Sequence, residues 1–393
     1  MSDSPLKAGF TPGVRLAAAL GLLVVIGFLE AQHPFTSFRL VTFILAFFAF
    51  ACAASALRGA IQNGFVLFSA LSLGLSLAEG VATIADSRVL AVLADGFSVP
   101  QPVIGLGPQH AGRFHAEKRE GPSHPLIYSA DYTIDDNLLR QTLSASSGPT
   151  IAFFGDSFTF GEGLGDNDAL PQLFADLLNR KLRVLNFAYP GYGPQHFLAA
   201  LESGRFDGVI GAKPRLFIFM TGAGHAERAA CKPFWVRRWP RYVLENGQVI
   251  LKGACSEGLR EKIWAWLEDS AAYRLFVEPY FLRVTREDLR LYVEIIVKAI
   301  KLANEKYGVV TLIPYTFNPR LLKGTGMTDG EIVHRFEAAG GMVVDVDLGE
   351  DKSEGTALSI KGDGHPTALA NHFKAAIIKD YLASHAPSVL ALP

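Results

Sequence analysis

The chain has 393 residues, of which 49% are hydrophobic and 19% are charged, and its formal net charge at pH 7 is −1. This length suits a membrane region together with one large domain or two modest ones. Because the charge is balanced and no cluster of lysine and arginine is interleaved with aromatic residues, nothing in the composition points to nucleic acid as a partner.

The hydrophobic excess lies near the N-terminus, in three segments at residues 14–29, 40–57 and about 59–85. A membrane-spanning helix needs about 20 residues, with a range of about 17–25. The second segment has that length, the first reaches it if Arg15 extends to the interface, and the third is interrupted by Glu79. We therefore expect about three transmembrane helices within residues 1–90, with two spans or a buried helical bundle as alternatives. The sequence leaves the role of Glu79 open.

The charges around these segments predict their orientation. Lys7 and Arg15 precede the first segment and Arg58 lies between the second and third, whereas Arg39 shares the other loop with Glu30. The positive-inside rule then places the N-terminus in the cytoplasm. With three spans, everything after about residue 90 lies outside the cytoplasm.

Residues 91–147 are rich in proline, glycine and histidine and are predicted to form a connector with short strands. From residue 148 to residue 393, apolar runs alternate with helical patterns, which is typical of a parallel α/β sheet. The expected strands lie at residues 150–155, 182–188, 215–220, 309–315 and 342–348, and the expected helices at residues 167–180, 193–204 and 365–385.

An insertion at about residues 223–307 separates the third of these strands from the fourth. Its helical patterns cover residues 257–282 and 286–308. Three aromatic residues precede them, either as a platform for sugar rings or, as we favour, as the core of the insertion: Trp235, Trp239 and Tyr242.

The insertion also contains a predicted β-hairpin, because Asn246 and Gly247 lie between two β-prone runs. Cys231 and Cys255 flank this hairpin, so its two strands would bring them together. In an oxidising compartment we expect a disulfide, and two unpaired buried thiols are the alternative.

Three motifs in this part of the chain resemble the sequence blocks of the SGNH/GDSL hydrolase superfamily. They are "FFGDSFTFGEG" after the first strand, "LNFAYPGYGPQH" after the second, and "GDGHPTALANH" before the last helix. The resemblance covers about residues 149–385. It implies a three-layer α/β domain with a parallel sheet, and acyl-ester chemistry without a cofactor or metal.

The resemblance assigns a catalytic triad to the first and last blocks. A serine hydroxyl is a poor nucleophile, so a base must take its proton, and an acid must orient that base. Ser157 is the expected nucleophile, His365 the base and Asp363 the acid. Many family members place the acid three residues before the histidine. Here it lies two before, as in the alginate O-acetyltransferase branch.

The resemblance also implies an oxyanion hole formed by the backbone N–H groups of Ser157 and Gly191. Family members add a side-chain donor from an asparagine in a third block. Here that block reads "TGAGHAER", and His225 stands about where the asparagine is expected. His225, Arg228 and Asn186 are therefore candidates for substrate binding. The alternatives are a loop histidine with other partners, a surface arginine, and an oxyanion hole without a side-chain donor.

These observations predict a serine esterase or O-acyltransferase in a bacterial cytoplasmic (inner) membrane, with its catalytic domain outside the cytoplasm. The expected substrates are ester groups of cell-envelope or exported carbohydrate, and a membrane partner that donates acyl groups is expected only if the reaction is transfer. Lipid or thioester hydrolysis and a non-catalytic glycan-binding scaffold are the alternatives. The carbohydrate assignment rests on analogy at the level of the fold.

Overall fold

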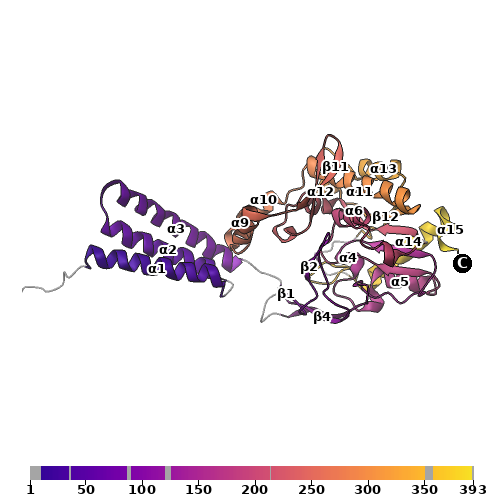
Figure 1. Cartoon of the computed structure of the whole chain (residues 1–393), viewed down its shortest axis with the longest axis horizontal. Helices are drawn as coiled ribbons and strands as arrows, with labels where there is room; N and C mark the ends of the chain where they lie inside the picture. The colour runs from indigo at the N-terminus through magenta and orange to yellow at the C-terminus, as the bar shows by residue number, and fades with distance from the viewer. Residues whose placement is uncertain are drawn as a thin grey trace, which may run out of the picture. The chain divides into compact units, whose positions relative to one another are not determined.

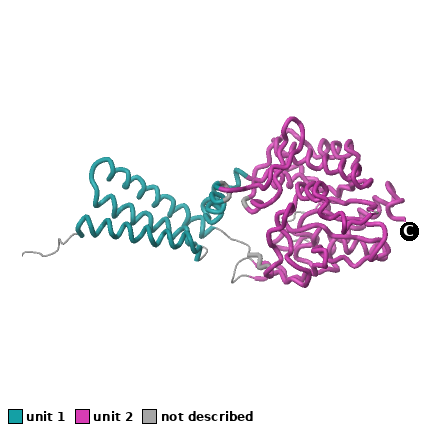
Figure 2. Tube along the Cα trace, viewed as in Figure 1, with its two compact units in different colours: residues 1–87, 259–281 teal, residues 88–258, 282–393 magenta. Residues whose placement is uncertain are grey.

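The computed structural model describes residues 10–34, 37–85, 90–119, 125–212, 214–349 and 357–391 (Figure 1). It divides into two compact units (Figure 2). The first contains residues 1–87 and 259–281, and the second contains residues 88–258 and 282–393. The chain therefore passes between the two units three times, because part of the predicted insertion belongs to the N-terminal unit.

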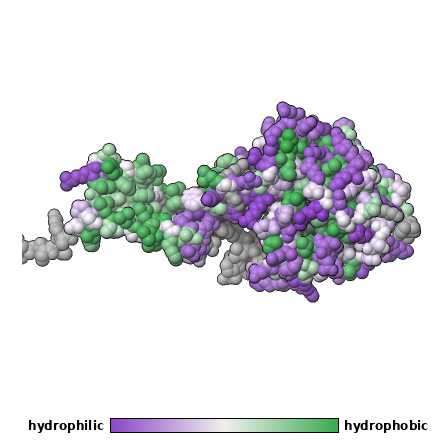
Figure 3. All heavy atoms as spheres, in the orientation of Figure 1, coloured by the Kyte–Doolittle hydropathy of each residue, from purple (hydrophilic) through white to green (hydrophobic). Residues whose placement is uncertain are grey.

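The first unit contains three helices, α1 (Pro12–Gln32), α2 (Phe38–Ala56) and α3 (Gly59–Ala85). Each is long and apolar enough to cross a membrane by length and composition, which agrees with the predicted spans. Hydrophobic side chains cover much of their surface (Figure 3). A surface of this kind is stable in lipid and unfavourable in water.

The same unit contains residues 259–281, where the sequence predicts one long helix. The structure instead has α9 (Gly258–Glu268), then a π-helical turn at Tyr273–Val277 that continues into α10 (Glu278–Phe281). The break occurs at Ser270, whose hydroxyl oxygen accepts the N–H of Tyr273 at 3.1 Å. A serine that binds a backbone N–H three residues later starts a new helix, which explains the interruption.

The second unit is built on a parallel sheet. Its strands lie in the spatial order β13 (Met342–Asp345), β12 (Val310–Thr316), β8 (Pro214–Phe219), β6 (Thr150–Phe154) and β7 (Arg183–Asn186), and the short β9 (Thr221–Gly222) pairs with β12. In chain order this arrangement is 2-1-3-4-5. The strand order therefore reverses between β6 and β8, and ligands of open α/β sheets bind at such a point.

Helices cover both faces of this sheet, as the three-layer expectation requires. One core contains Ala152 and Phe154 of β6 together with residues of α6 (Pro194–Ser203), α11 (Arg286–Tyr307) and α13 (Asp329–Ala338). The other contains Ile151 and Phe153 together with residues of α5 (Leu170–Leu177) and α14 (Ala368–His385). Successive β6 side chains thus enter opposite cores, which is why this strand is apolar throughout.

The predicted connector forms an antiparallel sheet in the second unit. Its strands are β1 (Leu90–Leu93), β4 (Gly112–Arg119) and β5 (Leu126–Ile134), in the order β1-β4-β5. Arg140 forms bridges with Ile134 on one side and Asn186 of β7 on the other. This small sheet is therefore joined to the edge of the main sheet. Its core includes Phe160, three residues after Ser157.

The predicted hairpin consists of β10 (Pro240–Glu245) and β11 (Gln248–Ala254). It brings Cys231 and Cys255 together as a disulfide with a Cα–Cα distance of 5.4 Å. Both cysteines are buried with Trp239 and Val236 in a small core of their own. Trp239 therefore has the core role that the sequence favoured.

Candidate active site

Ser157 lies directly beyond the carboxyl end of β6. Asp156 caps the short helix α4 (Ser157–Phe160), and its side chain accepts the N–H of Phe158 at 3.0 Å. A Cβ atom at Gly155 would lie 2.2 Å from the hydroxyl oxygen of Thr159, so only glycine fits between the strand and this turn. The turn therefore presents Ser157 at the edge of the sheet where the strand order reverses.

His365 approaches Ser157 from the loop that precedes α14. Its Nε2 atom lies 2.8 Å from the Ser157 hydroxyl oxygen, and its Nδ1 atom lies 2.5 Å from Asp363 Oδ2. In the neutral tautomer with the proton on Nδ1, His365 donates to the carboxylate and accepts from the serine hydroxyl. The structure thus brings the three predicted side chains into one hydrogen-bonded relay.

Gly191, from the second block, has a φ of +86°, a conformation that favours glycine. A Cβ atom there would lie 3.0 Å from the Trp239 ring and 3.1 Å from the Trp235 ring. These two tryptophans of the insertion therefore pack against the loop that carries Gly191. A larger residue would have to displace an indole ring as well as strain the backbone.

The three sequence blocks follow strands of the parallel sheet or precede its last helix, in the chain order that the sequence predicts. Ser157 of the first block meets His365 of the last. The structure therefore agrees with the α/β fold that the resemblance of the three blocks implies. No family model matches its sequence, and no curated protein matches it.

Three of the solved structures with a similar fold are the following. TesA is 15% identical, with a TM-score of 0.34 over 59% of this chain and 97% of that one. A carbohydrate acetylesterase family member from Sinorhizobium meliloti is 12% identical, with a TM-score of 0.35 over 62% and 99% of the two chains. The psychrotrophic esterase EstA from Pseudoalteromonas sp. is 12% identical, with a TM-score of 0.33 over 60% and 100%.

The relay of Ser157, His365 and Asp363 is surrounded by charged groups that the sequence did not reveal. Asp363 forms an ion pair with Lys118 of β4 through its second oxygen. Burial alone would raise the pKa of Asp363, but its contacts with His365 and Lys118 outweigh burial and hold the pKa below its usual value. Asp363 is therefore ionised at neutral pH, as an orienting acid must be.

Glu162 is a second carboxylate beside His365. Its Oε2 atom lies 3.6 Å from His365 Nε2, and its Oε1 atom accepts the hydroxyl of Tyr128 at 3.0 Å. Burial lowers the pKa of His365, but the hydrogen bond to Asp363 and the negative charge of Glu162 outweigh it and raise the pKa above its ordinary value. The site is thus arranged to stabilise the imidazolium form of His365.

Arg140 anchors the loop that follows Ser157. Its guanidinium group is buried and donates to the carbonyl oxygens of Phe160, Gly161 and Leu164 at 2.6–2.7 Å. It also contacts the carboxylate of Asp166 at 3.3 Å. One side chain from the predicted connector therefore fixes the path of the loop that carries Glu162.

His225 and Arg228 both bind the aspartate of the Gly-Asp-Ser motif. His225 Nε2 lies 3.0 Å and Arg228 Nη1 2.9 Å from Asp156 Oδ2. Burial raises the pKa of Asp156, but these two partners hold it well below its usual range. His225 Nδ1 also lies 2.9 Å from the Thr221 hydroxyl, so both ring nitrogens are engaged. An additional bond from His225 to an oxyanion would require one of these contacts to break.

Asn186, the third residue predicted to bind substrate, does not have the position that this role requires. It is only 1% exposed, and its side-chain oxygen accepts the N–H of Ala188 at 3.1 Å. A substrate has no access to a side chain in this position, so the structure does not support a binding role. Asn186 instead shapes the turn that leads from β7 towards Gly191.

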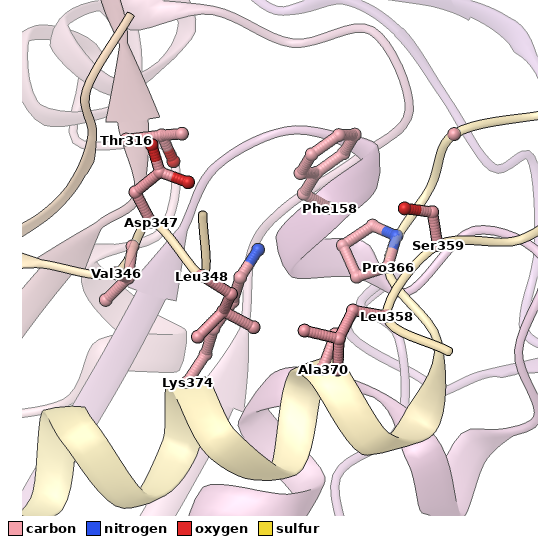
Figure 4. Close-up of a pocket in the computed structure, with 11 residues that line it drawn as sticks. Phe158, Thr316, Val346, Asp347, Leu348, Leu358, Ser359, Pro366, Ala370 and Lys374 are labelled. Carbon is pink, nitrogen blue, oxygen red and sulfur yellow. The ribbon is translucent and has the colours of Figure 1, made fainter. Parts of the chain in front are cut away.

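Phe158, the residue after Ser157, lines two hollows. The larger has a volume of about 230 Å³, and its wall includes Asp156, His225 and Arg228. The smaller has a volume of about 30 Å³, and Lys374 reaches into it from α14 (Figure 4). Because the larger hollow includes the residue before Ser157, it is the better candidate for a substrate.

Proposed function

We propose that this chain is a membrane-anchored serine esterase or O-acyltransferase that works through an acyl-serine intermediate. The relay from Ser157 through His365 to Asp363 supports this function most directly. A purely structural serine does not need a partly buried imidazole at 2.8 Å that is itself bound to an ionised carboxylate.

In the first half of the reaction, the Ser157 oxygen attacks the carbonyl carbon of the ester while His365 Nε2 takes the hydroxyl proton. Asp363 stabilises the resulting imidazolium. The N–H groups of Ser157 and Gly191 stabilise the oxyanion. The intermediate then collapses, and the leaving alkoxide takes the proton from His365, which leaves an acyl group on Ser157.

In the second half, His365 takes a proton from the acceptor as the acceptor oxygen attacks the acyl group. Water as acceptor releases a carboxylic acid, and a sugar hydroxyl yields a new ester. In both cases Ser157 leaves with the proton from His365, so the enzyme returns to its starting state. The groups on the protein are the same for hydrolysis and transfer.

The substrate we propose is an ester on cell-envelope or exported carbohydrate. Trp235 supports it, because this side chain is 41% exposed and lies beside Gly191. The Arg228 guanidinium lies 5.6 Å from its ring. An exposed indole beside a fixed cation offers an apolar face and a polar donor to a sugar ring. From the predicted orientation of the spans, we further propose that the site faces the extracytoplasmic side of a bacterial inner membrane.

The proposal is tested on the full chain in lipid nanodiscs with an aryl acetate and with an acetylated oligosaccharide. We expect both esters to be cleaved, and Ser157→Ala to abolish both reactions. Trp235→Ala should raise KM for the oligosaccharide while it leaves aryl acetate cleavage nearly unchanged. If Trp235→Ala affects neither ester and long-chain acyl esters are preferred, a lipid or thioester hydrolase is the better assignment. If the folded wild type cleaves nothing, the glycan-binding scaffold replaces the enzyme.

Adding an unacetylated oligosaccharide to the same reaction separates hydrolysis from transfer. A transferase yields acetylated sugar at the expense of free acetate, and an esterase does not. Only a transferase calls for a membrane partner that delivers acyl groups.

A further inference from the structure

The N-terminal unit contains a buried carboxylate that its helices alone do not explain. Glu79 of α3 is 2% exposed. Its carboxylate accepts the Ser270 hydroxyl and the Ala271 N–H at 2.7 Å each, and the Ala272 N–H at 3.1 Å. Glu79 therefore caps the helical segment that begins after Ser270, and it holds a distant part of the chain against α3.

A second buried group holds the same segment. Arg39 of α2 is 1% exposed and forms an ion pair with Glu30 of α1. It also donates to the carbonyl oxygen of Trp266 at 3.0 Å, lies 3.6 Å from Asp269, and has its guanidinium carbon 4.4 Å from the centre of the Trp266 ring. All three apolar helices thus contribute to one attachment for residues 266–272.

These contacts lie near the ends of the apolar helices. A helix rises 1.5 Å per residue, so about 20 residues cross the roughly 30 Å hydrocarbon core. In α3, counted from Gly59, the twentieth residue is Ala78, and Glu79 follows it. Arg39 is the second residue of α2. In a bilayer spanned by these helices both charges would lie at the interface, where a charged residue costs far less than at the centre of the membrane.

The attached segment exposes an unusual amount of apolar surface. Eight large hydrophobic side chains between residues 259 and 281 are 39–74% exposed: Leu259, Ile263, Trp266, Leu275, Phe276, Val277, Tyr280 and Phe281. The segment also contains two of the four tryptophans of the chain. Tryptophan and tyrosine are enriched at the headgroup level of membranes.

We propose that residues 259–281 form a second membrane-contacting element, which lies in the headgroup interface of a phospholipid bilayer. The bilayer is the occupant of its exposed apolar face, because the segment is fixed to the interfacial ends of membrane-length helices. Glu79 and Arg39 act as the latch that holds it there. Short helices with apolar and charged faces bind membranes in this way without crossing them.

The test measures the depth of nitroxide labels on the full chain in phosphatidylcholine nanodiscs. Labels are placed at Phe276→Cys and Phe281→Cys in a Cys52→Ser background, with Leu251→Cys on β11 as the aqueous control. At the two segment positions we expect a ratio of oxygen to nickel-chelate collisions several-fold higher than at Leu251. A ratio equal to that at Leu251 would overturn the proposal. Low collision rates with both reagents would also overturn it, because a protein would then cover the segment.

The latch is tested in the same labelled proteins. Glu79→Ala should lower the collision ratio at Phe276, and Glu79→Gln, which keeps an acceptor oxygen, should lower it less. Ser72→Ala is the matched control, because Ser72 is buried in the same helix but bonds to Phe68. An unchanged ratio in Glu79→Ala would contradict the role of the latch. None of these readouts depends on Ser157, so the enzymatic proposal and this one can fail separately.

Discussion

Lys118 of β4 forms an ion pair with Asp363, whose other oxygen binds His365. The two residues are 245 positions apart in the sequence. Lys118 belongs to the antiparallel sheet of the predicted connector, whereas Asp363 belongs to the last of the three sequence blocks. The small sheet therefore takes part in the site that we propose to be catalytic.

Replacing Lys118 tests that connection. The positive charge of Lys118 lowers the pKa of His365, so Lys118→Met should raise that pKa further. The base must be neutral to accept a proton, so the acid limb of kcat/KM should move to higher pH. At pH 7 we expect a loss of roughly tenfold, largely recovered at pH 9, and Lys118→Arg should retain the wild-type profile. A loss that is the same at every pH would show that Lys118 is only a structural support.

Replacing Glu162 should have the opposite effect on the pH profile. Glu162 raises the pKa of His365, so the neutral Glu162→Gln variant should have a lower His365 pKa and an acid limb at lower pH. The amide side chain of this variant keeps an oxygen to accept the Tyr128 hydroxyl. The measurement is kcat/KM for an aryl ester between pH 5 and pH 9. An acid limb at unchanged or higher pH would exclude an electrostatic role for Glu162.

Arg140→Met should destabilise the second unit. The substitution leaves three carbonyl oxygens and Asp166 without the guanidinium group that binds them. Removing one partner of a buried charged network costs on the order of 3–5 kcal/mol. Denaturant unfolding of the full chain in detergent measures this loss. The ammonium group of lysine has one donor centre, whereas guanidinium is a planar fork of several donors. Arg140→Lys should therefore recover less than half of the lost free energy of unfolding. Wild-type stability in Arg140→Met would contradict the anchoring role.

Removing the disulfide should also destabilise the second unit. Cys231 and Cys255 are 24 positions apart, and closing a loop of that size stabilises a fold by about 2–4 kcal/mol. The double replacement by serine should lower the unfolding temperature, and a reducing agent should lower that of the wild type but not of the variant. Insensitivity of the wild type to reduction would indicate free thiols, and would weaken the case for an oxidising compartment.

Local patterns in the sequence were sufficient for the strands, whereas the resemblance of the blocks to the SGNH/GDSL superfamily implied the meeting of Ser157 with His365. The apolar run before Gly155 and the helical period after Thr367 are local signals, and the order of the blocks linked them. Glu162 was visible within the first block, but nothing in its neighbours indicated that it would approach His365.

The contribution of Lys118, Tyr128 and Arg140 to the site could not be predicted from the sequence, for a different reason. Their partners lie far away in the sequence, so no local pattern indicates the contacts. A lysine or arginine near a strand is also typical of a solvated surface. The break at Ser270 was missed because the helical period continues across it. It depends on Glu79, which lies 191 residues earlier and binds the Ser270 hydroxyl.

The central claim is that Ser157 is an activated nucleophile. The most direct measurement is reaction of the full chain in nanodiscs with a fluorophosphonate, followed by intact mass of the wild type, Ser157→Ala and His365→Ala. The account predicts one adduct on the wild type, none on Ser157→Ala and strongly slowed labelling of His365→Ala. A folded wild type that stays unlabelled, or that labels as fast without His365, would contradict it.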